Sequence, residues 1–263
     1  MCATCGCSDG PGVRVTEPGA THAHPHDHGH EHDHDHDNGH SHEPGRTVLL
    51  EQKVLARNDE RAERNRRWLV GRDVLAVNLM SSPGSGKTTL LERTIRELGA
   101  QVPMSVVEGD QETMFDAERI RATGARVVQV NTGAGCHLDA DMLAAALRRL
   151  APPERSVVLI ENVGNLVCPA LFDLGEHGRA VVMSVTEGAD KPLKYPHMFR
   201  TADVVLLNKI DLLPYVDFDL ARFQEALHVV NPGTGVVQLS ATRGDGMSGW
   251  YGWLRERAGL AVG

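Results

Sequence analysis

The sequence has no long apolar run, and this absence excludes several classes of protein. None of its hydrophobic stretches approaches the ~20 apolar residues that a membrane-spanning helix needs. Its first residues also lack the apolar core of a secretory signal. Basic residues are outnumbered, with 27 Lys and Arg against 35 Asp and Glu, which disfavours a nucleic-acid partner. We therefore expect a cytoplasmic protein that binds neither membrane nor nucleic acid.

Cysteine is also scarce, and its five copies are unevenly placed. Cys2, Cys5 and Cys7 crowd into the first seven residues, and an odd total fits metal-binding thiols in a reducing cytosol better than paired disulfides. The C-x₂-C spacing can bring two thiolates onto one metal, and Gly6 lets Cys7 turn back toward it. With the neighbouring chain amine, this set suits Ni²⁺ or Zn²⁺. A flexible tail without a metal is the alternative.

Histidine is concentrated in one stretch, where ten of the fourteen copies lie between His22 and His42 among acidic residues. Nothing apolar is available there to bury, so residues 8–45 are predicted to be a linker and a disordered segment. Imidazole and carboxylate groups at this density bind Ni²⁺, Cu²⁺ and Zn²⁺. Nickel storage by this segment is one hypothesis, and a solvated spacer is the other.

Residues 80–90, MSSPGSGKTTL, lie between an apolar run and a helix-like run. Two glycines let the backbone curl, so that N–H groups and the positive end of the helix form an anion cradle. Lys87 can reach the terminal phosphates of a nucleotide, and Thr88 can place its hydroxyl on Mg²⁺. Ser81 stands where the usual pattern has its first glycine. The predicted phosphate-binding residues are Gly84, Ser85, Gly86, Lys87, Thr88 and Thr89.

A second group of motifs indicates which base the nucleotide carries. Asn208, Lys209 and Asp211 follow an apolar run, and the Asp211 carboxylate can accept from the N1–H and the exocyclic amine of guanine. Ser240 and Ala241 follow another strand-like run and would supply a backbone donor to guanine O6. In this order the motifs resemble those of the P-loop GTPases, which makes GTP and GDP the expected nucleotides.

Strand-like and helix-like runs alternate from residue 74 onward, which predicts an α/β fold with a mostly parallel sheet and helices on both faces. The GTPase domain should span residues 46–263 and begin with an amphipathic helix within Val48–Leu69. The expected strands are Val74–Met80, Pro103–Val107, Arg126–Val130, Val157–Ile160, Ala180–Val185, Val204–Leu207 and Val236–Leu239. The expected helices are Thr88–Leu98, Glu112–Thr123, Asp139–Leu150, Phe218–Val229 and Met247–Ala258.

Polar residues follow several of these strands, at the edge where ligands bind in such sheets. Asp110 is predicted to hold a water bound to Mg²⁺, with an ordinary turn carboxylate as the alternative. Glu161 stands at the Walker-B position, where Glu in place of Asp favours a water-mediated role, and Gly164 would offer an N–H to the γ-phosphate. Asn165 stands where small GTPases often have glutamine, so water positioning is unassigned. The catalytic candidates are Lys87, Thr88, Asp110 and Glu161.

Cys136, His137 and Cys168 form a second candidate metal site near the nucleotide loops. Cys136 and His137 are expected at the start of a helix, where adjacent side chains point about 100° apart and do not easily share one ion. Three ligands from one chain also leave a metal underfilled, so a two-fold partner could complete the site. Structural cysteines with a capping histidine are the alternative.

Several segments of the sequence together resemble the hydrogenase nickel-incorporation GTPases, the HypB family, over nearly the whole chain. These segments are MCATCGC, SSPGSGKTT, EGDQET, GCHLDADM, ENVGNLVCP, TEGADKPLKYPHMF, NKIDLLP and LSATRGDG. The resemblance implies GTP hydrolysis that assists nickel insertion into [NiFe] hydrogenase. It implies a tight nickel site at the three leading cysteines, and a weaker nickel or zinc site at Cys136, His137 and Cys168 in a nucleotide-dependent homodimer. It also implies two partners, the hydrogenase large-subunit precursor and a companion nickel-maturation protein of the HypA type.

Two alternatives to this reading differ from it in testable ways. The urease accessory GTPases share the nucleotide motifs, but typically carry Cys-Pro-His where this chain has Cys136 joined directly to His137, and they lack the leading cysteines. A nickel buffer or storage protein with a vestigial nucleotide fold is the other alternative. The complete set of phosphate and base motifs argues against storage as the sole role.

Overall fold

The computed structural model describes residues 14–16, 44–110, 115–133 and 135–259. The predicted thiolate site at Cys2, Cys5 and Cys7 and the stretch His22–His42 lie outside these residues, so both stay predictions. Within the described ranges, no helix is both long enough and apolar enough to cross a membrane.

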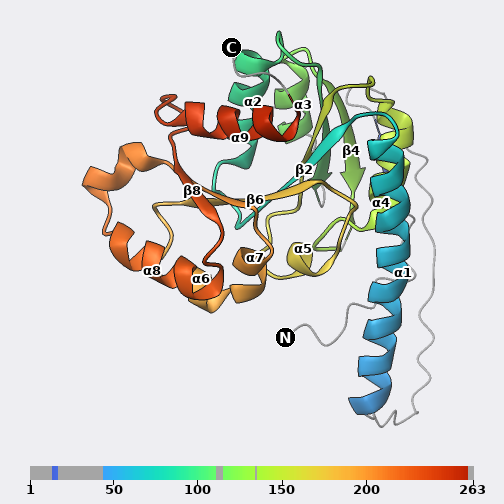
Figure 1. Cartoon of the computed structure of the whole chain (residues 1–263), viewed down its shortest axis with the longest axis horizontal. Helices are drawn as coiled ribbons and strands as arrows, with labels where there is room; N and C mark the ends of the chain where they lie inside the picture. The colour runs from blue at the N-terminus through green and yellow to red at the C-terminus, as the bar shows by residue number, and fades with distance from the viewer. Residues whose placement is uncertain (1–13, 17–43, 111–114, 134, 260–263) are drawn as a thin grey trace, which may run out of the picture.

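An eight-stranded sheet forms the centre of the described part of the chain (Figure 1), in the order β1-β4-β3-β5-β2-β6-β7-β8. Strands β2 to β8 run parallel to one another, which confirms the predicted α/β fold. Their bounds are β2 (Leu75–Ser81), β3 (Met104–Asp110), β4 (Arg126–Asn131), β5 (Val157–Glu161), β6 (Gly178–Ser184), β7 (Val204–Asn208) and β8 (Gly235–Gln238).

Strand β1 (Arg14–Thr16) lies within residues 8–45, which were predicted to be a linker and a disordered segment. It pairs antiparallel with β4, with Arg14 opposite Asn131 and Thr16 opposite Gln129. Two of its three residues are β-branched, which favours strand geometry, and the pairing covers the edge of β4. A three-residue strand is too short to show a period in the sequence.

The helices cover both faces of the sheet, because the parallel strands are buried on both sides. In β2, Leu75, Val77 and Leu79 belong to the core beneath α2 and α9, whereas Ala76 belongs to the core beneath α1 and α4. The helices are α1 (Pro44–Val70), α2 (Lys87–Leu98), α3 (Phe115–Arg121), α4 (Ala140–Leu150), α5 (Cys168–Leu171), α6 (Lys191–Lys194), α7 (Pro196–Arg200), α8 (Leu220–Val230) and α9 (Met247–Arg257), with a 3₁₀ helix η1 (Ile210–Tyr215).

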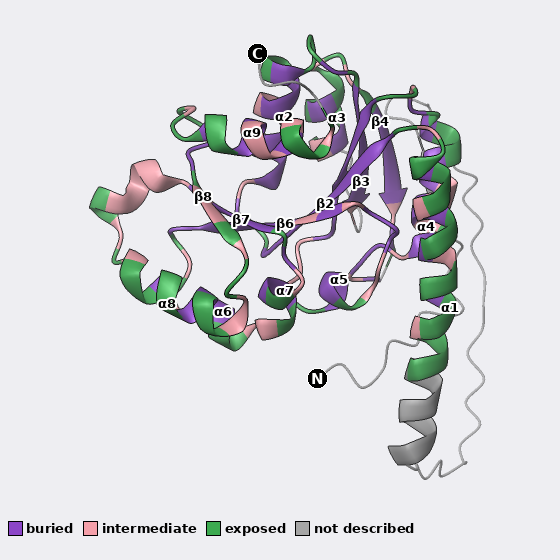
Figure 2. Ribbon diagram, viewed as in Figure 1, coloured by how far each residue is buried: buried purple, intermediate pink, exposed green. Residues whose placement is uncertain are grey.

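Helix α1 begins two residues before the predicted domain boundary and runs beside α4 (Figure 1). Figure 2 shows that much of its outer surface is exposed, and two asparagines lie on its buried side. Asn58 Oδ1 accepts from the Ala140 N–H at 2.9 Å, and its Nδ2 donates to Asp173 O at 2.7 Å. Asn65 Nδ2 donates to Ala140 O at 2.8 Å. Helix α1 therefore fixes the start of α4 against the segment that follows α5.

Candidate nucleotide and metal site

The loop between β2 and α2 has the left-handed backbone that a curled phosphate cradle requires. Gly84 has φ 74° and Gly86 has φ 97°, and Gly86 is the N-cap of α2. A Cβ on Gly86 would lie 2.6 Å from Asn208 Nδ2, so both the dihedral angle and the space require glycine. The N–H groups of this loop and the amino end of α2 together favour an anion.

Ser81, the departure from the usual phosphate-loop pattern, contacts the lysine of the same loop. Lys87 Nζ donates to Ser81 Oγ at 2.6 Å, and Ser81 Oγ donates to Ser82 O at 2.6 Å. Burial lowers the pKa of Lys87, and the carboxylate of Glu161 opposes that shift. The serine thus gives the buried ammonium a polar partner.

Two buried carboxylates lie beside Thr88 at neighbouring positions of β3 and β5. Glu108 is opposite Glu161 in the strand register, and Thr88 Oγ1 donates to Glu161 Oε1 at 2.8 Å. Burial, with the charge of Glu161 added, raises the pKa of Glu108 to about 9. Burial also raises the pKa of Glu161 to about 7, against the opposing charge of Lys87. Oε2 of each carboxyl lacks a hydrogen-bond partner among the described residues.

These groups line a cavity of about 530 Å³ at the carboxyl ends of the strands. Its wall is formed by residues 83–89, 108–110 and 161–164, with Asp116, Arg119 and Lys209. The predicted residues Asp110 and Gly164 are both among them, and a Cβ on Gly164 would lie 3.2 Å from atoms of Pro83. Every predicted phosphate-binding residue and every catalytic candidate therefore lines this one cavity.

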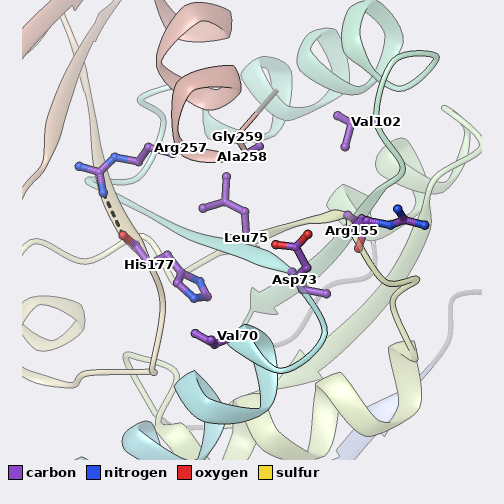
Figure 3. A pocket seen from close by; sticks show the side chains of 11 residues that line it. Val70, Asp73, Leu75, Val102, Arg155, His177, Arg257, Ala258 and Gly259 are labelled. Atoms are coloured by element: carbon purple, nitrogen blue, oxygen red, sulfur yellow. Dashed lines mark hydrogen bonds between the residues drawn. The ribbon is translucent and has the colours of Figure 1, made fainter. Parts of the chain in front are cut away.

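A second cavity, of about 410 Å³, lies at the amino ends of the central strands (Figure 3). Its polar lining includes Asp73 and His177, and Arg257 Nη1 donates to His177 O at 2.9 Å. Ligands of parallel α/β sheets bind at the carboxyl ends of the strands, whereas this cavity lies at the amino ends. We therefore take the larger cavity as the candidate nucleotide site.

Three charged residues of the cavity are not among the predicted site residues: Glu108, Asp116 and Arg119. Glu108 is an acidic residue that directly follows the apolar Val106 and Val107 on β3, and this contrast is visible in the sequence. Arg119 Nη2 donates to Thr89 Oγ1 at 3.2 Å and to Glu92 Oε2 at 2.8 Å, while its Nη1 donates to Asp116 Oδ1 at 3.2 Å. Asp116 and Arg119 lie on α3, where helical spacing alone gives no indication of a site.

Asn208 ties the phosphate loop to the predicted base-binding loops. Its Nδ2 donates to Ser85 O at 2.9 Å, and its Oδ1 accepts from the Ala241 N–H at 3.0 Å. Lys209, with φ 63°, donates from Nζ to Gly84 O at 2.8 Å. Asp211 lies on η1, and its Oδ2 is 4.0 Å from Arg243 Nε.

One detail of the base site differs from the prediction. The Ala241 N–H donates to Asn208, and the Ser240 N–H donates to Asp245 O at 2.8 Å. Both N–H groups are therefore engaged within the protein, so neither is a free donor for guanine O6. Asn165 is engaged as well, because its Oδ1 accepts from the Val167 N–H at 2.8 Å.

The ligand atoms of Cys136, His137 and Cys168 all lie within 4.8 Å of one another in a single chain. The expectation that the first two diverge on a helix is wrong, because both lie in the loop before α4 begins at Ala140. Cys136 Sγ is 3.7 Å from His137 Nδ1, and Cys168 is buried at the start of α5.

The surroundings of His137 suit a neutral metal ligand. Its ring stacks on Phe172 with centroids 3.9 Å apart, which fixes the plane of the ring. Burial lowers the pKa of His137, against the charge of Asp139, so the neutral imidazole that binds metals is favoured. Two thiols and one imidazole are soft ligands suited to Zn²⁺ or Ni²⁺.

Residues 75–238 of the chain match the family model "CobW/HypB/UreG, nucleotide-binding domain". It is therefore a nucleotide-binding protein of this class. It is 54% identical over 220 residues to the hydrogenase maturation factor HypB of Escherichia coli K12, which covers 82% of this chain and 76% of that protein. It is 47% identical over 286 residues to HypB of Azotobacter vinelandii, with 100% and 94% covered. The chain belongs to the HypB family of hydrogenase maturation factors, as its motifs predicted.

Two solved structures resemble this one. HypB from Archaeoglobus fulgidus has a TM-score of 0.73 and 40% identity, covering 78% of this chain and 100% of that chain. HypB from Helicobacter pylori in complex with nickel has a TM-score of 0.72 and 36% identity, covering 77% and 95%.

Proposed function

We propose that this chain hydrolyses GTP to GDP and phosphate and uses the nucleotide state to control nickel at Cys136, His137 and Cys168 during [NiFe] hydrogenase maturation. One observation carries the proposal: a single segment, residues 161–168, takes part in both sites. Its first residue, Glu161, lines the nucleotide cavity, and its last, Cys168, is one of the three clustered ligands. A change at the γ-phosphate is therefore transmitted along one short piece of chain.

For GTP hydrolysis, the phosphate loop binds the nucleotide through backbone N–H groups, and Lys87 stabilises the charge that develops on the transferred phosphoryl group. Gly164 presents its N–H toward the γ-phosphate. The Asp211 carboxylate selects guanine through two donors that adenine does not have in that pattern. Thr89 completes the phosphate-binding loop.

The cavity also fits a magnesium ion. The buried Oε2 atoms of Glu108 and Glu161 lack partners among the described residues and are hard oxygen ligands. The Thr88 hydroxyl lies beside them, because it donates to the other carboxyl oxygen of Glu161. Thr88 would hold Mg²⁺ directly, with Asp110 and Glu161 acting through water. The ion supplies charge neutralisation for the phosphates.

For nickel, two thiolates and a neutral imidazole form three sides of a site, and Zn²⁺ competes for the same ligands. The nickel complex of the H. pylori relative supports the choice of metal. A fourth ligand from a second copy of the chain would close the site, so GTP or metal favours a homodimer. The hydrogenase large-subunit precursor and a HypA-type protein are the proposed cytoplasmic partners.

The decisive experiment measures nickel affinity and oligomer mass with GDP and with a non-hydrolysable GTP analogue. It uses the full chain with Cys2, Cys5 and Cys7 replaced by serine, so that the tail does not report. We expect a larger assembly with the GTP analogue and a nickel affinity that differs between the two states. Equal nickel affinities in both states would overturn the proposed control, even if all three residues proved to be ligands.

A further inference from the structure

We infer that Asn162 is the positioning residue through which the nucleotide loop and the metal loop sense one another. This inference rests on the proposed function, because it names the contact that carries the control. Asn162 follows Glu161 directly and lines the nucleotide cavity, with only 1% of its surface exposed. Its own N–H donates to Leu79 O at 3.1 Å, which fixes its backbone to β2.

The carboxamide of Asn162 contacts both loops with one oxygen. Oδ1 accepts from the Val163 N–H at 3.0 Å, on the segment that leads to Gly164. The same oxygen accepts from the Leu138 N–H at 3.2 Å, on the residue that follows His137. A displacement of Val163 toward or away from a γ-phosphate therefore changes the hydrogen bond that holds the metal loop.

The other end of the amide is anchored, so the oxygen cannot simply follow one loop. Asn162 Nδ2 donates to Asn78 Oδ1 at 3.2 Å, and Asn78 Nδ2 donates to Glu176 Oε1 at 3.2 Å. Glu176 in turn accepts from Arg179 Nε at 2.6 Å and from the Leu174 N–H at 2.8 Å. Because Asn162, Asn78 and Glu176 are buried, breaking this chain of bonds leaves buried polar groups without partners.

Only an amide satisfies this position. Two backbone N–H donors require an acceptor at Oδ1, and the acceptor on Asn78 requires a donor at Nδ2. Alanine at this position removes the link between the loops and leaves the metal ligands and the phosphate loop in place. The expected consequence is a loss of communication between two sites that each still bind.

The first test measures coupling in the full chain with Cys2, Cys5 and Cys7 replaced by serine. Nickel affinity is measured with GDP and with a GTP analogue, and the ratio of the two affinities is the coupling factor. We expect a factor of about fivefold or more in the parent chain, within the usual range for coupled sites. In Asn162→Ala the factor should fall toward one, while nickel binding remains measurable in both nucleotide states, because Cys136, His137 and Cys168 are retained.

Asn165→Ala is the matched control, because Asn165 lies on the same segment. Among the described residues, its side chain forms one hydrogen bond, in which Oδ1 accepts from the nearby Val167 N–H. It should keep the parent's coupling factor. An undiminished factor in Asn162→Ala would overturn the inference. A factor of one in the parent itself would instead show that the proposed nucleotide control has failed, so the two failures are distinguishable.

A second measurement does not depend on how the variant folds. Amide hydrogen exchange of the Leu138 N–H is followed in the parent chain with GDP and with the GTP analogue. Because this donor is held by the Asn162 oxygen, we expect its protection to differ between the two states. If the nickel affinity differs between the two states but the protection of the Leu138 N–H does not, the coupling does not depend on the Asn162 hydrogen bond.

Discussion

The nucleotide cavity and the metal cluster are adjacent in the fold, but they are assembled in different ways. Seven consecutive residues, 83–89, line the cavity, so a short piece of sequence determines most of its phosphate-binding surface. The cluster instead takes Cys136 and His137 from one loop and Cys168 from another. Those loops are brought together by packing between distant parts of the chain, including the hydrogen bonds from α1 to Ala140 and Asp173, so the cluster depends on long-range packing in a way that the cavity does not.

The two regions also differ in their charge. The cavity contains buried ionisable groups, among them Lys87, Glu108 and Glu161, whose pKa values are shifted by burial and by one another. The cluster contains two thiols and an imidazole whose neutral form is favoured. Changes in the cavity should therefore alter catalysis and pH dependence, whereas changes in the cluster should alter metal binding and leave the nucleotide bound.

The largest expected effect comes from Lys87→Ala. The ammonium meets developing charge on the phosphoryl group, so we expect GTP turnover to fall by at least about 10²–10³-fold. Nickel affinity of the cluster with GDP should change little, because Lys87 contacts none of its ligands among the described interactions. Steady-state phosphate release measures the first effect, and Lys53→Ala on the exposed side of α1 is the control. Turnover that survives in Lys87→Ala would remove this residue from the catalytic set.

The next effect in size concerns the base. In the proposed base site, Asp211→Asn removes a carboxylate that would accept two hydrogen bonds from guanine, each worth about 1.5–3 kcal/mol when one partner is charged. We expect GTP affinity to fall about tenfold to a hundredfold or more, and affinity for xanthosine triphosphate to rise. Competition binding with GTP and xanthosine triphosphate measures the change in base preference. Asp217→Asn, at a nearby exposed position, is the control. Retained GTP affinity would show that another group reads the base.

The converse change is made in the metal cluster. Cys168→Ala removes one of the three proposed metal ligands. Since the loss of even an outer partner typically costs about 10–100-fold in metal affinity, we expect at least a tenfold loss here. GTP binding should be retained. Nickel titration of the chain lacking the three leading cysteines measures the loss, and Leu171→Ala on the exposed side of α5 is the control. A large loss of GTP affinity in Cys168→Ala would mean that the two regions are not separable.

The difference in assembly explains how much could be predicted from the sequence. Apolar runs punctuated by turns identified each parallel strand, as with the expected Val157–Ile160 and the observed β5 at Val157–Glu161. The loop residues that line the cavity could be predicted because they are close together in the sequence. Helices α5, α6 and α7 were not predicted, because each has only four or five residues, fewer than two turns of period.

The remaining errors arose where the outcome depends on residues distant in the sequence. Cys136 and His137 were placed on a helix, whereas α4 begins only after the Asp139 cap, whose side chain accepts from the Met142 N–H. Their convergence on Cys168 is a property of packing. The role of Asn162 is not evident from the sequence either, because two of its partners are distant along the chain. Asn78 lies on β2, and Leu138 lies in the loop before α4.

The smallest expected effect tests the cavity's charge directly. In the folded protein the pKa of Glu108 is raised to about 9, well above its ordinary value. Below the ordinary pKa both the folded and the unfolded chain hold this proton, so the stabilising contribution is complete there. As pH rises toward 9 the unfolded chain releases the proton while the folded chain keeps it, so stability is progressively lost. One such group changes stability by about 1.4 kcal/mol per pH unit at most.

Glu108→Gln removes this titration and keeps the shape of the side chain. Without Mg²⁺ or nucleotide, we expect the parent to lose about 1–2 kcal/mol more stability than the variant between pH 5.5 and 8, allowing for relaxation around the site. Denaturant unfolding in the presence of a chelator measures the difference at each pH, and Glu60→Gln on the exposed side of α1 is the control. Parallel pH profiles of parent and variant would show that the carboxylate is already ionised in the folded chain. The cavity would then contain a fixed negative charge, and its preference for a divalent cation would come from that charge and not from a proton that the cation displaces.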